Sequence, residues 1–253
     1  MSWDPEVYLK FATERTRPAI ELLERVPLRA PSRVIDLGCG PGNSTGLLAA
    51  RWPDAQIEGL ESSPEMLAKA RASGLRAAWM QGDVQSWAPA AQYDVVFSNA
   101  VFQWIPDHRA LLPRLMENVA KGGVLAFQVP RNFDAPSHAL MREVANAGPW
   151  AAKLADAKLR NVLPPEVYFD ILAPLSTSLD IWETIYLQVL EGADPVLAWV
   201  SGTGLRPFVQ PLDEKAREAF IAQYRAQLRE AYPRRVDGKT LFPFQRLFVV
   251  ATR

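Results

Sequence analysis

The first half of the chain alternates between short β-branched segments and segments whose apolar residues recur at helical spacing. A strand over Arg33–Leu37 runs through a glycine-rich loop into a helix over Ser44–Arg51, and the same order then recurs. This alternation predicts a parallel sheet with helices on both faces. Further strands are expected over 56–60, 76–80, 93–98 and 124–129, and further helices over 15–26, over 64–71 and through 111–119, the last of them stopping at Gly122-Gly123.

The second half is expected to be mainly helical, because prolines interrupt its helical segments and no strand pattern occurs before Trp182. A strand over 182–190, an amphipathic helix from about Asp213 and a strand over 247–251 complete the chain. The predicted fold is α/β, a doubly wound Rossmann-like, seven-stranded, mostly parallel sheet with helical insertions that form a lid. The chain is expected to be one domain, with a cofactor-binding core over 1–130, insertions over 131–181 and 191–240, and late strands over 182–190 and 241–253.

Charge and cysteine content narrow the possible partners. Lys plus Arg and Asp plus Glu both total 28, so no excess positive field favours nucleic acid or an anionic membrane. We expect a small-molecule substrate and a cytoplasmic protein, because neither a signal sequence nor a membrane-spanning run is present. The single cysteine, Cys39, excludes an internal disulfide and argues against a cysteine-based zinc site, and no metal is expected.

The loop after the first predicted strand indicates an adenine-containing cofactor. Asp36-Leu37-Gly38-Cys39-Gly40-Pro41-Gly42 places an acidic residue before three alternating glycines. A dinucleotide fingerprint needs a sixth-position glycine, and Asn43 stands there, which disfavours a nicotinamide-dependent reductase. Glu61 follows about 20 residues after the loop, where a carboxylate can accept hydrogen bonds from both ribose hydroxyls.

This loop resembles motif I of the class I S-adenosylmethionine methyltransferases. The resemblance implies S-adenosyl-L-methionine as cofactor and S-adenosyl-L-homocysteine as product. It also implies that Asp83 meets the adenine amino group and that the next backbone amide, of Val84, meets a ring nitrogen. The expected cofactor-binding residues are Asp36, Gly38, Cys39, Gly40, Glu61, Ser62, Met66, Asp83, Val84 and Asn99.

Simpler structural roles compete with these assignments. The glycines can form a tight turn, and Glu61 or Asp83 can cap a helix. Cys39 is expected to be a packing residue, because nothing nearby would lower the pKa of its thiol. His108 is expected to begin a helix, and His138 has no recognisable partner in the sequence.

Segments outside the loop resemble the trans-aconitate 2-methyltransferase family. These are Trp3-Asp4-Pro5, Tyr8, Glu14–Pro18, Gly202-Thr203-Gly204-Leu205-Arg206-Pro207 and Pro243–Phe248. The resemblance covers nearly the whole chain and implies the monomethyl ester of trans-aconitate or a similar small polycarboxylate as product. A carboxylate is already an anion at neutral pH, so no general base is needed and we expect no catalytic residue beyond those that position the reactants.

A polycarboxylate needs cations to hold it, and arginine suits this role because it binds carboxylates in a bidentate manner. Arg206 and Arg246 are the expected clamps, and Arg131 and Arg142 are weaker candidates with an alternative role as solvated charges. Trp104 follows the fourth strand, where donor and acceptor should meet. Tyr8 and Arg17 either close over the cofactor or pack a helix.

Two other functions stay open at this point. One is carboxyl methylation of a malonyl carrier-protein thioester, which would need an exposed basic docking patch. The other is a non-catalytic protein that binds S-adenosylmethionine without transferring its methyl group. The oligomeric state, the carboxyl group that is methylated and the selectivity between isomers do not follow from the sequence.

Overall fold

The structure is a computed structural model that describes residues 12–155, 157, 162–202 and 204–253. Tyr8 lies outside the described residues. The elements in chain order are α2 (Ala12–Glu24), β1 (Arg33–Leu37), α3 (Asn43–Arg51), β2 (Gln56–Glu61), α4 (Pro64–Ala72), β3 (Ala78–Gln81), β4 (Tyr93–Asn99), η1 (Phe102–Trp104), α5 (His108–Glu117), β5 (Val119–Pro130), α6 (Pro136–Ala147), η2 (Ala151–Leu154), α7 (Pro165–Leu172), η3 (Ala173–Leu175), β6 (Ser178–Leu190), α8 (Pro195–Ser201), α9 (Arg206–Val209), α10 (Glu214–Ala231) and β7 (Thr240–Thr252).

The strands form a seven-stranded sheet in the order β3-β2-β1-β4-β5-β7-β6. The strands β1 to β5 pair in parallel, whereas β7 runs antiparallel to β5. The chain order reverses at β1, which has β2 on one side and β4 on the other. This confirms the predicted mostly parallel sheet and places a topological switch point at the carboxyl end of β1, where sheets of this type bind ligands.

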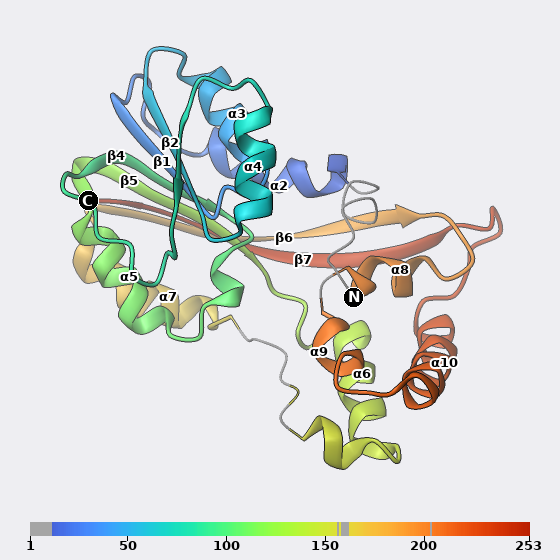
Figure 1. The fold of residues 1–253 in the computed structure, drawn as a ribbon. Helices are drawn as coiled ribbons and strands as arrows, with labels where there is room; N and C mark the ends of the chain where they lie inside the picture. Colours follow the sequence, from blue (N-terminus) through green and yellow to red (C-terminus); the bar gives the residue numbers. More distant parts are fainter. Residues whose placement is uncertain (1–11, 156, 158–161, 203) are drawn as a thin grey trace. The chain divides into compact units, whose positions relative to one another are not determined.

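Both faces of the sheet are covered, since residues that point to either face of its strands are buried. Ile35, Val96 and Phe127 pack in one apolar core with α5 and α7, which lie together in Figure 1. Val34 and Phe97 point to the opposite face and are equally buried. No helix in the part of the chain described above combines the length and apolar character of a membrane span.

The chain divides into two compact units. The sheet unit comprises 13–130, 162–184 and 246–253, and the helical unit takes in the described parts of 131–161 together with 185–245 outside Thr203. The helical unit has its own core, in which Phe220 and Tyr224 of α10 join Trp199 and Phe242. The Tyr224 hydroxyl donates to the backbone oxygen of Ser137 at 2.6 Å, which ties α10 to α6.

Several element boundaries differ from the sequence expectation. α5 ends at Glu117, and Gly122-Gly123 lie inside β5, which begins at Val119. Gly122 has a φ of 76° there, and the register with β4 shifts between Tyr93 and Val95, so the glycines mark an irregularity in the strand rather than a helix end. β6 begins earlier than expected, at Ser178, and β7 begins at Thr240, ahead of the strand pattern over 247–251 but close to the expected segment 241–253.

His138 gives the helical unit a pH-dependent stability. Burial, and to a lesser extent the positive charge of Arg142, lowers the pKa of His138 from 6.5 to about 4. In the unfolded chain the His138 imidazole is protonated as the pH falls below 6.5, whereas in the native state it stays neutral until about pH 4. The free energy of unfolding therefore falls as the pH drops from 6.5 towards 4. At pH 5 this loss amounts to roughly 2 kcal/mol.

We expect His138→Gln to remove this part of the pH dependence. Urea unfolding of both proteins at pH 7 and pH 5 measures it. The loss in free energy of unfolding between the two pH values is compared, so the cost of the substitution itself cancels. The wild type should lose roughly 2 kcal/mol more than the variant between the two values. Equal losses in both proteins would contradict the assignment.

Candidate functional site

The loop after β1 owes its shape to glycines with left-handed backbone angles. The φ values are 73° at Gly38, 55° at Gly40 and 95° at Gly42. A Cβ at Gly38 would lie 2.4 Å from Val101 Cγ2. The N–H groups of Gly38 and Cys39 both donate to the Leu60 oxygen, at 2.8 and 3.0 Å. These bonds fix the loop against the end of β2.

Gly40 is the position where the loop is open. A Cβ built there would meet no atom within 4 Å, in contrast to Gly38. Gly42 is the N-cap residue of α3, so the amides of the first helical turn, which have no partners within the helix, lie beside the same loop. The loop therefore offers a ligand close access to the backbone next to a helix N-terminus.

Asp36 lies beneath this loop and is fully buried. Its Oδ2 accepts hydrogen bonds from the hydroxyls of Ser44 and Thr45, both at 2.7 Å, while its buried Oδ1 has no partner among the described residues. Burial outweighs these two bonds and raises the pKa of Asp36 to about 6, so it is still an anion at neutral pH. The carboxylate thus anchors the start of α3 and places a negative charge below the loop.

Glu61, the last residue of β2, lies against the glycine loop. Its Oε2 accepts the Gly40 N–H at 2.9 Å, and its Oε1 accepts the Ser63 N–H at 2.8 Å and the Ser62 hydroxyl at 3.3 Å. Glu61 does not cap α4, because Ser63 is the N-cap residue and accepts the Met66 N–H. The carboxylate is half-buried at the edge of the open loop, as a ribose acceptor would require.

Asp83 follows β3 in an exposed turn. Its Oδ1 accepts the Gln85 N–H at 2.8 Å and its Oδ2 accepts the Gln85 side-chain amide at 3.2 Å. The neighbouring Val84 is buried, and its oxygen accepts a bond from Arg114. The turn is therefore ordered by its own contacts, and the Asp83 carboxylate stands at the carboxyl end of β3.

A polar row crosses β4, β5 and β7 near the carboxyl end of β4. Arg246 Nη1 donates to Gln128 Oε1 at 3.0 Å, and Gln128 Nε2 donates to Asn99 Oδ1 at 2.6 Å. Gln128 is paired with Asn99 across β4 and β5, and both Gln128 and Arg246 are buried. The row connects one expected cofactor residue, Asn99, with one expected substrate residue, Arg246, through Gln128, which the sequence analysis missed.

The segment after β4 is strained at its first residue. Ala100 has a φ of 58° and is the one non-glycine residue with a positive φ over the part of the chain with described geometry. The Gln103 side-chain amide donates to the Ala100 oxygen at 2.6 Å. The short η1 helix follows and ends at Trp104, which is 45% exposed. This strained turn lies where β4 leaves the sheet.

His108 is the first residue of α5, as expected, and its side chain is hydrogen-bonded to the segment after β4. Its Nε2 is 2.7 Å from the Phe102 oxygen and its Nδ1 is 2.6 Å from the Tyr168 hydroxyl. Because a carbonyl only accepts, Nε2 carries the proton and Nδ1 accepts from Tyr168. Burial lowers the pKa of His108, so the ring stays neutral and both nitrogens are used in structural bonds.

The other expected substrate residues are spread over the two units. Arg206 begins α9 and is half-buried. Arg142, on α6, donates to the Phe133 oxygen at 2.6 Å, and Arg131 follows β5. Arg17 pairs with Glu21 one helical turn away on α2, at 2.9 Å, an ordinary surface ion pair. Arg246, by contrast, belongs to the hydrogen-bonded row that includes the expected cofactor residue Asn99.

Cys39 is buried inside the loop. Burial raises the pKa of its thiol, and the carboxylates of Asp36 and Glu61 raise it further, so the thiolate is not formed at neutral pH. A packing role agrees with the sequence expectation.

Comparisons with known proteins identify the family. Residues 11–166 match the model of the methyltransferase domain family. The chain is 53% identical to a trans-aconitate 2-methyltransferase of Azoarcus sp. (strain BH72), over 100% of this chain and 99% of that protein. It is 51% identical to a trans-aconitate 2-methyltransferase of Streptomyces avermitilis, over 99% and 96% of the two chains.

Solved structures share the fold at low sequence identity. The YcgJ protein from Bacillus subtilis matches with a TM-score of 0.61 and 12% identity, over 94% of this chain and 98% of that one. The plantazolicin methyltransferase BpumL in complex with SAH matches with a TM-score of 0.53 and 13% identity, over 98% and 90%. From its family model and its full-length relatives together, the chain belongs to the methyltransferase family that includes the trans-aconitate 2-methyltransferases.

Proposed function

We propose that this protein transfers a methyl group from S-adenosyl-L-methionine to one carboxylate of trans-aconitate or a similar small polycarboxylate. The products are the monomethyl ester and S-adenosyl-L-homocysteine. Full-length relatives with this activity in their names support the substrate class. The observation that carries the proposal is the row in which buried Arg246 is linked through Gln128 to Asn99 at the carboxyl edge of the sheet.

The glycine loop fits the cofactor in shape and charge. Gly40 leaves room for close approach to the backbone, and the Glu61 carboxylate at that point suits a pair of ribose hydroxyls. S-adenosylmethionine carries a positive sulfonium, and the anionic Asp36 beneath the loop supplies a compensating charge. Gly38, Cys39, Ser62, Met66, Asp83, Val84 and Asn99 complete the proposed cofactor site.

An anionic acceptor explains why a base is unnecessary. The bound cofactor supplies an electrophilic methyl group on sulfur. Transfer to a carboxylate would form an oxygen–carbon bond and break the carbon–sulfur bond, whose electron pair would stay on sulfur; it would need no proton transfer from this chain's residues, so their role would be to position the acceptor. His108 has both ring nitrogens occupied, which agrees with a reaction that depends on positioning. Arg246 is proposed to hold a carboxylate that does not react, because pairing the attacking one would weaken it as a nucleophile.

Arg206, Arg131, Arg142, Trp104, Tyr8 and Arg17 stay predictions as further substrate contacts, as does the lid role of the helical insertions. Labelled methyl transfer from S-adenosylmethionine tests the acceptor, with trans-aconitate, cis-aconitate, isocitrate and malonyl carrier protein offered separately. Label on trans-aconitate is the expected result. Label only on malonyl carrier protein would favour the carrier-protein alternative, and bound cofactor without any labelled product would favour a non-catalytic protein.

We expect Gly40→Ala to weaken cofactor binding, because the new methyl group fills the space left for the ligand. Gly74→Ala is the matched control, since Gly74 also has a positive φ, 74°, and no atom within 4 Å of a built Cβ. Both variants should lose about 1 kcal/mol of stability from backbone strain. Calorimetry should show roughly ten-fold weaker S-adenosylmethionine binding in Gly40→Ala alone. Equal binding by both variants would exclude close contact at Gly40.

A further inference from the structure

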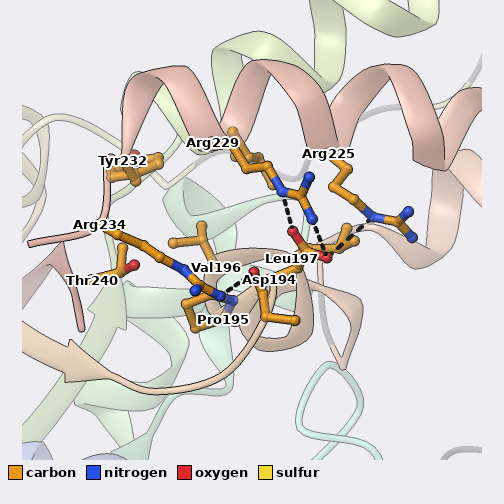
Figure 2. A pocket seen from close by; sticks show the side chains of 11 residues that line it. Asp194, Pro195, Val196, Leu197, Arg225, Arg229, Tyr232, Arg234 and Thr240 are labelled. Atoms are coloured by element: carbon orange, nitrogen blue, oxygen red, sulfur yellow. Dashed lines mark hydrogen bonds and ion pairs between the residues drawn. The ribbon is translucent and has the colours of Figure 1, made fainter. Parts of the chain in front are cut away.

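The helical unit contains a cavity of about 400 Å³ between the start of α8 and the end of α10. Arg225 and Arg229 reach it from α10, and Arg234 reaches it from the segment that follows (Figure 2). Asp194, just before α8, is the one acidic residue in its lining. No described residue among those expected to bind cofactor or methyl acceptor lines this cavity.

Two guanidinium groups pair with one carboxylate there, and a third guanidinium, of Arg234, lines the same cavity. Arg229 binds Asp194 in a bidentate manner, with Nε 2.7 Å from Oδ1 and Nη2 3.2 Å from Oδ2. Arg225 Nε lies 3.4 Å from Asp194 Oδ2 (Figure 2). The lining therefore has a net charge of +2, although the chain as a whole is neutral.

Two of the three arginines keep donors for a further acceptor. Arg225 makes the ion pair with Asp194 but no hydrogen bond to any described residue, and its Nε is buried. Arg234 Nη2 donates to the backbone oxygens of Gly192 and Ala193, at 2.7 and 3.0 Å, and this guanidinium has no carboxylate partner among the described residues. The bidentate Asp194–Arg229 pair already connects the residue before α8 to α10.

The remaining lining is largely apolar. Pro195, Val196 and Leu197 contribute from α8, and Leu228 and Tyr232 from the end of α10 and the residue after it. A cavity of this size with an apolar wall and few convergent polar groups is typical of small-molecule sites. Guanidinium groups match carboxylate and phosphate oxygens.

We propose that this cavity is a second ligand site, which binds a small organic anion with an apolar body and one or two carboxylate or phosphate groups. Arg225 and Arg234 contact the anionic groups, and the apolar wall covers the body. The site is separate from the residues proposed for methyl transfer, so binding there does not depend on trans-aconitate being the acceptor.

Calorimetry with two probes, phthalate and phenyl phosphate, tests the site and separates carboxylate from phosphate ligands. The protein is first saturated with S-adenosylhomocysteine alone, and the comparison between variants separates probe binding in the cavity from probe binding at the proposed methyl-transfer site. Arg225→Gln/Arg234→Gln removes two charges from the cavity. Lys215→Gln/Arg235→Gln removes two charges from exposed positions of the same unit that do not line it.

At least one probe should bind the wild type and the control variant with equal affinity. Its affinity for the cavity variant should be lower by roughly ten-fold or more. The single variant Arg225→Gln should also weaken binding, and it does not disturb any hydrogen bond of the described fold. Methyl transfer to trans-aconitate should stay at the wild-type rate in all three variants, which shows that they are folded. Equal probe affinities in the cavity and control variants, or no binding of either probe to the wild type, would overturn the proposal.

Discussion

Replacing Glu61 with alanine is expected to weaken S-adenosylmethionine binding by roughly a hundred-fold or more. Two effects combine in this variant. The ribose hydroxyls lose a charged bidentate acceptor, and the Gly40 and Ser63 N–H groups lose the carboxylate that orders the loop edge. Calorimetric titration with S-adenosylmethionine and S-adenosylhomocysteine measures the loss. Both ligands should be affected alike, since they share the ribose.

Glu65→Ala provides the matched control, because Glu65 is an exposed glutamate in the first turn of α4, four residues further along the chain. Glu61→Gln adds a second comparison: it keeps the size of the side chain but not its charge. If Glu61→Ala bound both ligands within about threefold of the wild type, the carboxylate would serve only to hold the loop. The Glu65→Ala variant should bind both ligands as the wild type does.

The sheet was largely predictable because its strands are short, apolar and separated by clear breaks. β1 has the bounds that its β-branched pattern predicted, Arg33–Leu37. The error at Gly122-Gly123 has a physical cause, since the same dipeptide suits a helix end and an irregular strand. Which of the two forms depends on pairing with β4, and pairing with a distant strand leaves no local signal. The strand pattern over 247–251 covers only the last part of β7, because Pro243 interrupts the pattern; its exposed position in the strand tolerates the proline.

The candidate site divides in the same way. Glu61 was found because its distance from the glycine loop follows from the strand–loop–helix order. Gln128 was missed because its role depends on two neighbouring strands, β4 and β7, that are distant in sequence. One signal was present, a single amide in the otherwise apolar run Val124–Val129. A buried amide needs partners, so such a residue marks a polar contact even when its partners cannot be named.

Arg246→Met is expected to raise the KM for trans-aconitate by roughly a hundred-fold while S-adenosylmethionine binding stays near the wild-type value. The reason is that the proposed clamp contacts the acceptor and not the cofactor. Gln128→Leu should raise the same KM by roughly ten-fold, because Arg246 and Asn99 both lose the amide that orients them. In the double variant the two effects should not add, since Gln128 acts on the acceptor through Arg246. Steady-state methyl transfer measures all three, and Arg71→Met, at an exposed position on α4, controls for the loss of one arginine.

Gln128→Glu separates charge from shape at the same position. A carboxylate at this buried site, one hydrogen bond from the Arg246 guanidinium, would form an internal ion pair and compete with the acceptor for that cation. We therefore expect its KM for trans-aconitate to rise as far as in Arg246→Met, although the side chain keeps its size and the arginine is still present. If Arg246 had only a structural role, the buried ion pair would preserve its position, and the KM of Gln128→Glu would stay within about threefold of the wild type. The substitution adds a carboxylate that competes with the substrate for Arg246 but does not harm a structural arginine. The measured KM therefore distinguishes the two roles of Arg246 directly.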